Sequence, residues 1–552
     1  MNPLSYACGL SPEPLRGLTV GDLLDETVNR FPDKEALVVP YQDIRWTYRQ
    51  LQWEVDRCAR AFLALGVRPG DRVGLWSPNR YEWLVVQLGT AKVGAILVNI
   101  NPSYRLHELG YALEQSGCAV VVTAEGFKKS DYLAMLRELV PEQPTERFPN
   151  LRHLIVLGET PQTGFLHWRA FLALADEVKE AELAAVQAVL DFDDPINIQY
   201  TSGTTGYPKG ATLSHHNIVN NSYFVTQRLR LTEADRLVIP VPLYHCFGMV
   251  LGNLGAISHG ATIIYSGDSF KAEEVLRVVE AEKATALYGV PTMFYAELDD
   301  PHFADYDLRS LRTGIMAGAL CPSDLMQRVN TLMHMEEVEI AYGLTETSPV
   351  VTQTAHNAPL TKRVNTVGKA MPHTEIKIID PVTGAIVPRG DTGELCARGY
   401  AVMLGYWRDE KRTRETIDEQ GWLHSGDLAT MDDEGYCTIV GRSKDMIIRG
   451  GENIYPKEIE HFLTTHPAIE QAQVIGVPDE KYGEEVCAWI KLEPGASLTA
   501  EEVTEFCKGH IAYYKVPRYL KFVDEYPMTV TGKIRKIDMR KMMEEELAAV
   551  VQ

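Results

Sequence analysis

The segment YTSGTTGYPKG, residues 200–210, brings small hydroxyl side chains, glycines and a single lysine into one short stretch. Backbone N–H groups that glycines leave accessible can converge on phosphate oxygens, and serine and threonine hydroxyls add further donors. Lys209 supplies a positive charge. The stretch therefore predicts a phosphate-binding loop, with a flexible surface linker as the alternative reading. It is not a Walker A loop, because glycine rather than a hydroxyl residue follows Lys209.

The elements that must hold this loop are visible in the sequence before it. INIQY (196–200) reads as a strand, and a helix is expected to start after the loop. The loop therefore leaves the carboxyl end of a strand, where open α/β sheets bind ligands. Nearer the N-terminus, helical and strand patterns alternate. This βαβ order implies a parallel sheet covered by helices, and the expected fold class is α/β. Strands are expected at 72–76, 95–100 and 119–123, and helices from 47 to about 65 and at 81–93.

Changes of pattern along the chain predict its organisation. Residues 141–186 are less regular and are expected to connect subdomains. From residue 374, short strands separated by turns (TEIKIID, GELCARG, YCTIVG) predict a small antiparallel or β-barrel-like subdomain. After GRSKD (441–445), the pattern indicates a compact α+β unit. We therefore expect an N-terminal domain at 1–441 and a C-terminal domain at 442–552.

The composition limits the classes of partner. The 552 residues carry a formal net charge of −21, which argues against nucleic-acid binding. Within residues 508–541, however, nine Lys and Arg stand against three Asp and Glu, which suits nucleotide phosphates. Nine cysteines without a CxxC pair indicate isolated thiols in a reducing compartment. No signal segment opens the chain and residues 83–100 read as a buried helix and strand, so no transmembrane segment and a cytoplasmic location are expected.

Ordered motifs along the whole chain resemble those of the AMP-forming acyl-CoA synthetases, members of the adenylate-forming superfamily. The segments PLYHCFG, MPHTE and GYWRDEKRT are most similar to the medium-chain fatty acyl-CoA synthetase branch. The resemblance implies ATP, Mg²⁺ and CoA, and a two-step reaction through an acyl-adenylate with release of pyrophosphate and then AMP. The motifs are TSGTTGYPKG, AYGLTETSP (341–349), GWLHSGDLA (421–429), GRSKDMIIRGGENIYPKEIE (441–460) and TVTGKIRK (529–536).

The resemblance also implies roles for single residues. Glu346 would hold Mg²⁺, Thr345 would contact the α-phosphate and Tyr342 would stack on adenine. Asp427 would accept hydrogen bonds from the ribose hydroxyls, with Arg442 on ribose and phosphate. The full set implied for ATP and AMP is Thr201, Ser202, Gly203, Thr204, Thr205, Lys209, Gly318, Ala319, Leu320, Tyr342, Gly343, Asp427 and Arg442.

Further roles implied by the resemblance concern the two half-reactions. Lys533 would bridge the carboxylate and the α-phosphate, and His245 would lie beside the acyl carboxylate. Lys444 would be the hinge between domains, and Gly450 and Gly451 would line a pantetheine tunnel, because glycine lets a thin thiol arm approach the backbone. Each of these residues also has a purely structural interpretation. His245 could be packed in the core, Lys533 could be a solvated surface side chain, and the glycine pair could form a tight turn. Thr345 and Glu346 could cap a helix start, and Asp427 could form an Asx turn.

The acid and the assembly stay open at this stage. A medium-chain fatty acid is the first expectation, and short branched, dicarboxylic or aryl acids are alternatives. PLYHCFGMV has no aspartate to pair with an amino-acid ammonium, and no carrier segment follows TGKIRK, so free CoA is the expected acceptor. The rival classes are a luciferase-like oxygenase and a non-catalytic nucleotide-binding or acyl-adenylate-binding protein. The oligomeric state is undetermined, with a homodimer among the options, and acylation of Lys533 is a hypothesis for regulation.

Overall fold

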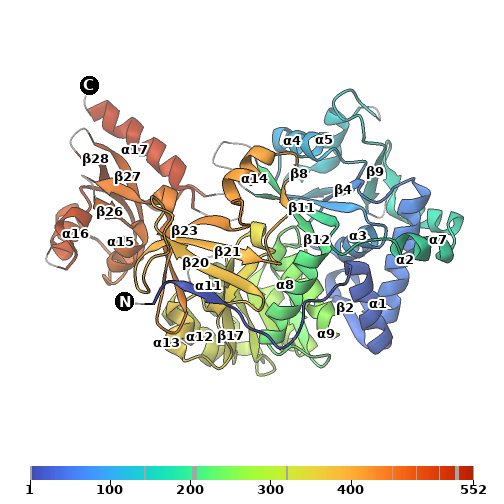
Figure 1. The fold of residues 1–552 in the computed structure, drawn as a ribbon, viewed down its shortest axis with the longest axis horizontal. Coiled ribbons are helices and arrows are strands. Elements are labelled where there is room, and N and C mark those ends of the chain that lie inside the picture. The colour runs from blue at the N-terminus through green and yellow to red at the C-terminus, as the bar shows by residue number, and fades with distance from the viewer. Residues whose placement is uncertain are drawn as a thin grey trace.

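The chain forms a mixed α/β structure that runs from two large sheets to a smaller C-terminal unit (Figure 1). In Figure 1 the blue-to-green half and the orange-to-red unit lie at opposite ends of the molecule. The computed structural model describes residues 3–141, 144–158, 160–201, 208–318, 321–449, 452–479, 482–508, 510–528 and 534–550.

The first large sheet has eight strands and is parallel up to β11. The hairpin partner β12 and the short β22 then add antiparallel to that edge. In spatial order the strands are β10 (Leu166–His167), β9 (His153–Leu157), β6 (Val120–Ala124), β4 (Arg72–Trp76), β5 (Ile96–Ile100), β11 (Pro195–Thr201), β12 (Lys209–Ser214) and β22 (Gly405–Tyr406).

The second large sheet has nine strands, with a parallel run from β17 to β2. Its parallel strands end at the edge where β17 leads into the AYGLTETSP motif. In spatial order the strands are β19 (Lys369–Ala370), β18 (Val350–Gln353), β17 (Glu337–Gly343), β16 (Thr313–Ala317), β15 (Ala286–Gly289), β13 (Arg236–Val238), β14 (Thr262–Ile264), β2 (Glu35–Val39) and β3 (Ile44–Thr47).

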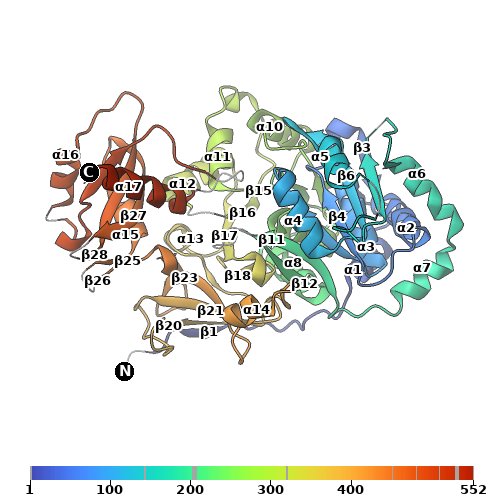
Figure 2. The same cartoon turned by 90° about the horizontal axis from the view of Figure 1, so that it is seen from above.

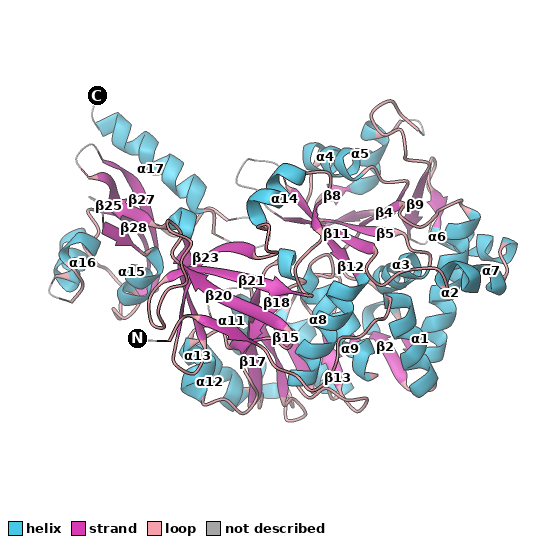
Figure 3. Ribbon diagram, in the orientation of Figure 1, coloured by secondary structure: helices cyan, strands magenta, loops and turns pink. Residues whose placement is uncertain are grey.

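Helices cover the first sheet on both faces, as Figure 3 shows for α4 and α5 on one side and α3 on the other. Alternate residues of β6 enter two different cores: Val120 and Val122 pack with α2 and α3, whereas Val121 packs with α4 and α5. A strand buried on both faces needs apolar residues throughout, which explains the run VVV. The helices of the large domain are α1 (Val20–Arg30), α2 (Tyr48–Ala64), α3 (Tyr81–Lys92), α4 (Leu106–Ser116), α5 (Tyr132–Leu139), α6 (Trp168–Ala173), α7 (Glu180–Gln187), α8 (His215–Arg228), α9 (Gly255–His259), α10 (Ala272–Glu282), α11 (Pro291–Leu298), α12 (Ser323–Leu332), α13 (Leu360–Asn365) and α14 (Glu410–Thr416).

Two five-stranded sheets are built mainly from residues after 370. One is antiparallel, with strands β1 (Tyr6–Cys8), β20 (Thr374–Ile379), β21 (Gly393–Gly399), β23 (Leu423–Met431) and β24 (Cys437–Arg442). The other builds the C-terminal unit, which Figure 2 shows at one end of the molecule. That unit contains β25 (Ile447–Arg449), β26 (Glu452–Ile454), α15 (Pro456–Leu463), β27 (Ile469–Asp479), β28 (Gly483–Leu492), α16 (Ala500–Cys507), β29 (Tyr519–Phe522) and α17 (Lys536–Val550).

Most strands and helices expected from periodicity form where the pattern placed them. The helix after Thr47 is α2, which begins with a capping box: Thr47 Oγ1 accepts from the Gln50 amide, and Gln50 Oε1 accepts from the Thr47 amide. The strand expected at 72–76 is β4, residue for residue. In the described part of the chain, no helix is long and apolar enough to cross a membrane.

Two expectations about connectivity are wrong. Residues 141–186 are more than a connection, because HLIVL forms β9 and extends the first sheet beside β6. Its continuous apolar run suits a strand buried between two layers. The segment after residue 207 forms β12 before helix α8 begins, so the glycine-rich loop joins two antiparallel strands, β11 and β12. Residues 202–207 themselves lie outside the described residues.

Candidate active site

Three separate segments meet at the carboxylate of Glu346. Glu346 lies in η5 (Thr345–Thr347), a single 3₁₀ turn directly after β17. Its Oε1 accepts a 2.8 Å hydrogen bond from the Tyr406 hydroxyl and a 3.4 Å hydrogen bond from the Thr201 hydroxyl. The last residue of β11, the end of β22 and the turn after β17 therefore converge at the ends of two sheets. This is the place where the sequence predicted a nucleotide site.

Lys209 adds a cation to this group. It opens β12 opposite Thr201, and its ammonium lies 4.9 Å from the centroid of the Tyr406 ring. The hinge candidate Lys444 lies near enough for the positive charges of Arg442 and Lys209 to act on it. Burial first, and then the charges of Arg442 and Lys209, lower the pKa of Lys444, whereas the carboxylates of Asp445 and Asp427 raise it. The ammonium therefore lies among charges of both signs. An anion placed here would meet several cations at once.

A second centre forms around the carboxylate of Asp427. The Tyr342 hydroxyl donates a 2.7 Å hydrogen bond to Oδ2, and Arg442 Nε lies 3.1 Å from Oδ1. Asp427 is 5% exposed, and its burial raises its pKa even though Arg442 and Tyr342 both lower it. Arg442 stays half-exposed, so a polar ligand has access to this pair.

The Asp427 carboxylate is presented by a bulge in β23. Cys396 pairs with His424 and Glu394 pairs with Leu428, so three residues of β23 lie opposite a single residue of β21. Gly426, at the centre of the bulge, has φ of +70°, a left-handed conformation that favours glycine. Glu394 Oε1 accepts the Gly426 amide at 2.9 Å and thereby anchors the bulge. Sequence analysis did not single out Glu394.

Backbone geometry explains two of the glycines that are predicted to contact the nucleotide. A Cβ on Gly343 would lie 1.7 Å from the carbonyl oxygen of Pro349, so no larger residue fits there. Gly318 follows β16 with φ of +86°, again a left-handed conformation. Ala317 and Ala341 are partners in the β16–β17 pair, which places Gly318 and Tyr342 at the same end of neighbouring strands.

His245 lies in a third segment, half-buried, just before the π-helix η3 (Phe247–Leu254). Its ring centroid is 4.1 Å from that of Tyr244. Burial, followed by the negative charge of Glu346, raises the pKa of the adjacent Cys246 thiol, so this segment lies within electrostatic range of Glu346. Phe247 stacks on Tyr288, and the Met249 sulfur accepts hydrogen bonds from buried amide groups. The role of His245 beside an acyl carboxylate stays a prediction.

Some predicted residues fall outside the described part of the chain, and their roles likewise stay predictions. Lys444 is described and lies in η6 (Ser443–Asp445), directly after β24. The residues outside are Ser202, Gly203, Thr204, Thr205, Ala319, Leu320, Gly450, Gly451 and Lys533.

Tyr406 is the contact that sequence reasoning missed. It touches both Glu346 and the cation of Lys209, and the proximity of Glu346 adds to burial in raising its pKa. The signal was present in GYWRDEKRT, which sequence analysis used only to judge similarity. Gly405 precedes Tyr406 and has φ of +143°, a backbone conformation that favours glycine.

Comparisons with known proteins identify the family of this chain. The family model described as "AMP-binding enzyme" matches residues 24–407, and that of the "AMP-binding enzyme C-terminal domain" matches residues 458–533. YngI of Bacillus subtilis (strain 168) is 49% identical over 95% of this chain and 96% of its own length. Medium-chain acyl-CoA ligase ACSF2, mitochondrial, of Rattus norvegicus is 46% identical over 99% of this chain and 90% of its own.

A solved structure gives the same result in three dimensions. The anthranilate CoA ligase AuaEII, in complex with anthranoyl-AMP, has a TM-score of 0.83 and 29% identity, covering 98% of this chain and 99% of its own. The chain therefore belongs to the AMP-binding enzyme family. Within that family it is an AMP-forming acyl-CoA synthetase, which uses ATP and CoA as substrates.

Proposed function

We propose that this enzyme activates medium-chain fatty acids, and that the residues around Glu346 and Asp427 bind the nucleotide. The observation that supports the acid is the similarity to the medium-chain acyl-CoA ligase of rat over nearly the whole of both chains. The observation that supports the residue roles is the convergence of Thr201, Tyr406 and Glu346 next to the Asp427 centre. Fatty acid metabolism would then be the cellular role.

The donor set around Glu346 fits Mg²⁺. That cation prefers oxygen ligands and binds through one or two carboxylates together with substrate phosphates. The described neighbours that bond to Glu346 are hydroxyls, and both bonds end on Oε1. Within the described residues, Oε2 receives no hydrogen bond and keeps its lone pairs for a cation. Bound there, Mg²⁺ would neutralise charge on the triphosphate.

In the first half-reaction the substrate carboxylate must approach the α-phosphate of ATP, and both are anions. The site therefore has to supply positive charge and align the two groups. Lys209 and the predicted Lys533 supply positive charge, and Thr345 is expected to contact the α-phosphate. Asp427 accepts hydrogen bonds from the ribose, with Arg442 beside it. Tyr342 is expected to stack on adenine while its hydroxyl bonds to Asp427.

In the second half-reaction CoA attacks the acyl-adenylate and AMP leaves. We propose that the domains at 1–441 and 442–552 rotate about Lys444 between the two steps. One pose brings Lys533 to the nucleotide, and the other brings Gly450 and Gly451 to the pantetheine arm. Lys444 lies within electrostatic range of Asp427 and Lys209 of the N-terminal domain, and these charge contacts would change with the domain pose.

The acid, the compartment and the assembly each need a direct measurement. Aryl acids stay an alternative because the structural relative AuaEII is an anthranilate CoA ligase. We keep the cytoplasm as the proposed compartment, although ACSF2 of rat is named as mitochondrial. A homodimer is the assembly to test by light scattering. Short branched and dicarboxylic acids are the other alternative substrates to test.

The deciding experiment is a screen for ATP-dependent and CoA-dependent AMP release over acids of graded length, including benzoate-type and dicarboxylic acids. The expected optimum is at medium chain length, with a strict requirement for Mg²⁺. A Lys533→Ala variant should lose adenylation but keep thioester formation from supplied acyl-adenylate. An optimum on aryl or dicarboxylic acids would overturn the acid assignment. Unchanged adenylation in Lys533→Ala would overturn the role of that lysine.

A further inference from the structure

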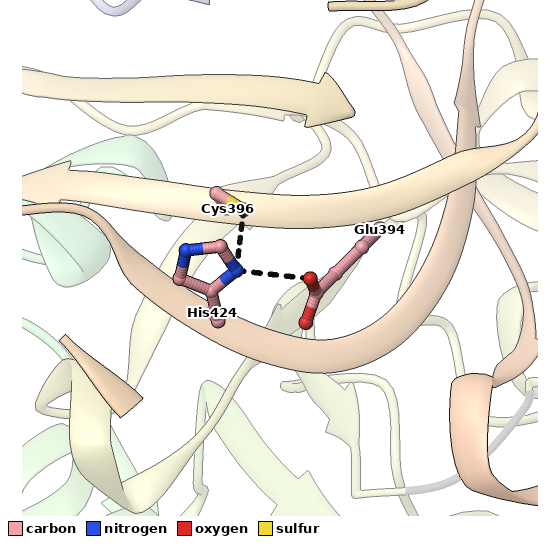
Figure 4. Close-up of side chains that lie close together, drawn as sticks. All are labelled: Glu394, Cys396 and His424. Carbon is pink, nitrogen blue, oxygen red and sulfur yellow. Dashed lines mark hydrogen bonds and ion pairs between the residues drawn. The ribbon is translucent and has the colours of Figure 1, made fainter. Parts of the chain in front are cut away.

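A cluster of a thiol, an imidazole and a carboxylate lies beside the nucleotide site. Glu394 and Cys396 are two residues apart on β21 and face the same side, and His424 of β23 is the direct cross-strand partner of Cys396 (Figure 4). His424 Nδ1 lies 2.9 Å from Glu394 Oε2 and 3.6 Å from Cys396 Sγ. The three ligand atoms all lie within 4.8 Å of one another.

These distances suit a tetrahedral metal ion. Zinc–sulfur bonds of about 2.3 Å and zinc–nitrogen bonds of about 2.0 Å place two tetrahedral ligand atoms about 3.5 Å apart. The separation of His424 Nδ1 and Cys396 Sγ is 3.6 Å. The Glu394 carboxylate is closer to the imidazole, at 2.9 Å, as expected when a proton rather than a metal lies between them. A small rotation of the Glu394 side chain would make room for the ion.

Neighbouring groups orient the side chains of the cluster. The other nitrogen of His424, Nε2, lies 3.8 Å from Asp418 Oδ2, which favours a proton on Nε2 and leaves Nδ1 for a ligand. The other oxygen of Glu394 is already bonded to the Gly426 amide. Cys396 is fully buried, whereas the His424 side chain is 32% exposed. An ion could therefore enter from the histidine side and keep one position open to solvent.

We propose that Glu394, Cys396 and His424 form a site for a Zn²⁺-class divalent cation, distinct from the Mg²⁺ position at Glu346. A thiolate and an imidazole select zinc-like metals, whereas the oxygen donors at Glu346 suit magnesium. On binding, the Cys396 thiol and the Nδ1 position of His424 lose their protons to solvent, and the metal takes the place of the shared proton. No other group of three such side chains lies this close within the described residues.

Metal binding at this cluster would affect the proposed nucleotide site. Glu394 would use Oε2 for the ion and Oε1 for the Gly426 amide, one residue before Asp427. Metal loading thus acts on the bulge that presents the Asp427 carboxylate. This consequence goes beyond the acyl-CoA synthetase reaction and does not depend on which acid the enzyme prefers.

The test is a titration of the full-length, chelator-treated protein with Co²⁺, followed by displacement with Zn²⁺. Cobalt is the probe because a thiolate–cobalt bond absorbs in the near ultraviolet. The background variant Cys8→Ser removes the exposed thiol. We expect one equivalent of Co²⁺ with a thiolate band, and loss of that band in Cys396→Ser. Cys437→Ser, a buried cysteine of β24 in the same sheet, is the matched control and should keep the band.

Two further variants keep the test decisive if Cys396→Ser does not fold. His424→Gln and Glu394→Gln retain the thiol but lose one ligand, and each should weaken Co²⁺ binding by at least about tenfold. Circular dichroism and melting without metal establish that each variant is folded. The proposal is overturned if the Cys8→Ser protein binds no Co²⁺ with a thiolate band, or if binding survives unchanged in both His424→Gln and Glu394→Gln.

Discussion

The Tyr342 hydroxyl donates a 2.7 Å hydrogen bond to the Asp427 carboxylate, and this bond joins the end of the parallel β17 to the bulge of the antiparallel β23. Two sheets of different type are thereby fixed relative to each other at the proposed nucleotide site. The tyrosine proposed to stack on adenine thus also orients the carboxylate proposed for the ribose. Adenine and ribose recognition would be coupled through one side chain.

Replacing Tyr342 by phenylalanine should therefore weaken ATP binding while the ring remains. A hydrogen bond to a charged group contributes about 1.5–3 kcal/mol, so the KM for ATP should rise about tenfold or more. Steady-state kinetics with varied ATP at saturating acid and CoA measure this. The control is Tyr295→Phe, which breaks a longer 3.4 Å tyrosine–aspartate contact with Asp324 elsewhere on the surface. Equal KM values for the wild type and Tyr342→Phe would show that the bond does not serve the nucleotide.

Glu346 offers a second prediction, on metal dependence. Glu346→Gln keeps a carbonyl oxygen for the Thr201 and Tyr406 hydroxyls but removes the charge that would hold Mg²⁺. We expect the rate of adenylation, measured by ATP–pyrophosphate exchange, to fall about a hundredfold. The Mg²⁺ concentration that gives the half-maximal rate should rise.

Tyr406→Phe is the matched control for Glu346. It removes the 2.8 Å hydrogen bond and leaves the carboxylate in place. The loss should be about tenfold, smaller than in Glu346→Gln, because a hydrogen bond to a charged group is removed while the charge that would hold Mg²⁺ is kept. If Glu346→Gln showed the Mg²⁺ dependence of the wild type, the carboxylate would not be the metal ligand.

The sequence predicted those parts of the site that lie inside compact motifs. Glu346 and Tyr342 stand four residues apart in YGLTET, and Asp427 lies in SGDLA. The resemblance of these motifs to the family implied their roles, which stay predictions. The α/β class and the individual strands were also predictable, because burial on one or both faces dictates the apolar pattern. The family comparison confirms both the fold class and the ligase class.

Contacts between distant segments could not be predicted in this way. Tyr406 is 60 residues from Glu346 in sequence, and only the pairing of β12 with β22 brings it to the site. Glu394 is 32 residues from Gly426, and its effect on Asp427 depends on the bulge in β23. A bulge is a property of strand register, which no single strand pattern contains.

That bulge yields a third prediction, on positioning. Glu394→Ala should remove the hydrogen bond between Glu394 Oε1 and the Gly426 amide, which weakens the anchoring of the bulge and lets the Asp427 carboxylate move. We expect the KM for ATP to rise about tenfold while kcat changes little, because Glu394 touches no reacting group. The assay contains a zinc-selective chelator together with excess Mg²⁺, so metal at the cluster plays no part while the reaction keeps its magnesium. Glu375→Ala on the adjacent β20, where Glu375 pairs with Arg398, is the control. A fall in kcat at constant KM would contradict a positioning role.

The fourth prediction concerns a buried carboxyl away from the site. Glu339 of β17 is 0% exposed, and burial raises its pKa to about 8. Gln353 Nε2 donates a 2.7 Å hydrogen bond to Glu339 Oε2, while Glu339 Oε1 and Gln353 Oε1 are both buried without a partner among the described residues. A proton on Glu339 Oε1 would give that oxygen a hydrogen to donate, so the neutral acid suits this environment better than the carboxylate.

The sign of the resulting pH dependence follows from proton binding. The folded state keeps the Glu339 proton up to about pH 8, whereas the unfolded chain loses it near the ordinary carboxyl value. Between those values the folded state binds more protons, so this group's contribution to the free energy of unfolding falls as pH rises and is constant above about pH 8. Glu339→Gln cannot lose a proton and should lack this contribution.

The melting temperature of Glu339→Gln minus that of the wild type should therefore increase from acidic pH towards pH 8. Glu375→Gln is the control of opposite sign, because the hydrogen bond from Arg398, and then that from Tyr6, lower the pKa of Glu375. Glu375→Gln should lower the melting temperature at neutral pH. This decrease should become smaller as the pH falls to values at which carboxyl groups take up protons. The comparison uses differences between proteins, so the other acidic groups cancel. A Glu339→Gln difference that stayed constant with pH would show that Glu339 is ionised alike in both states.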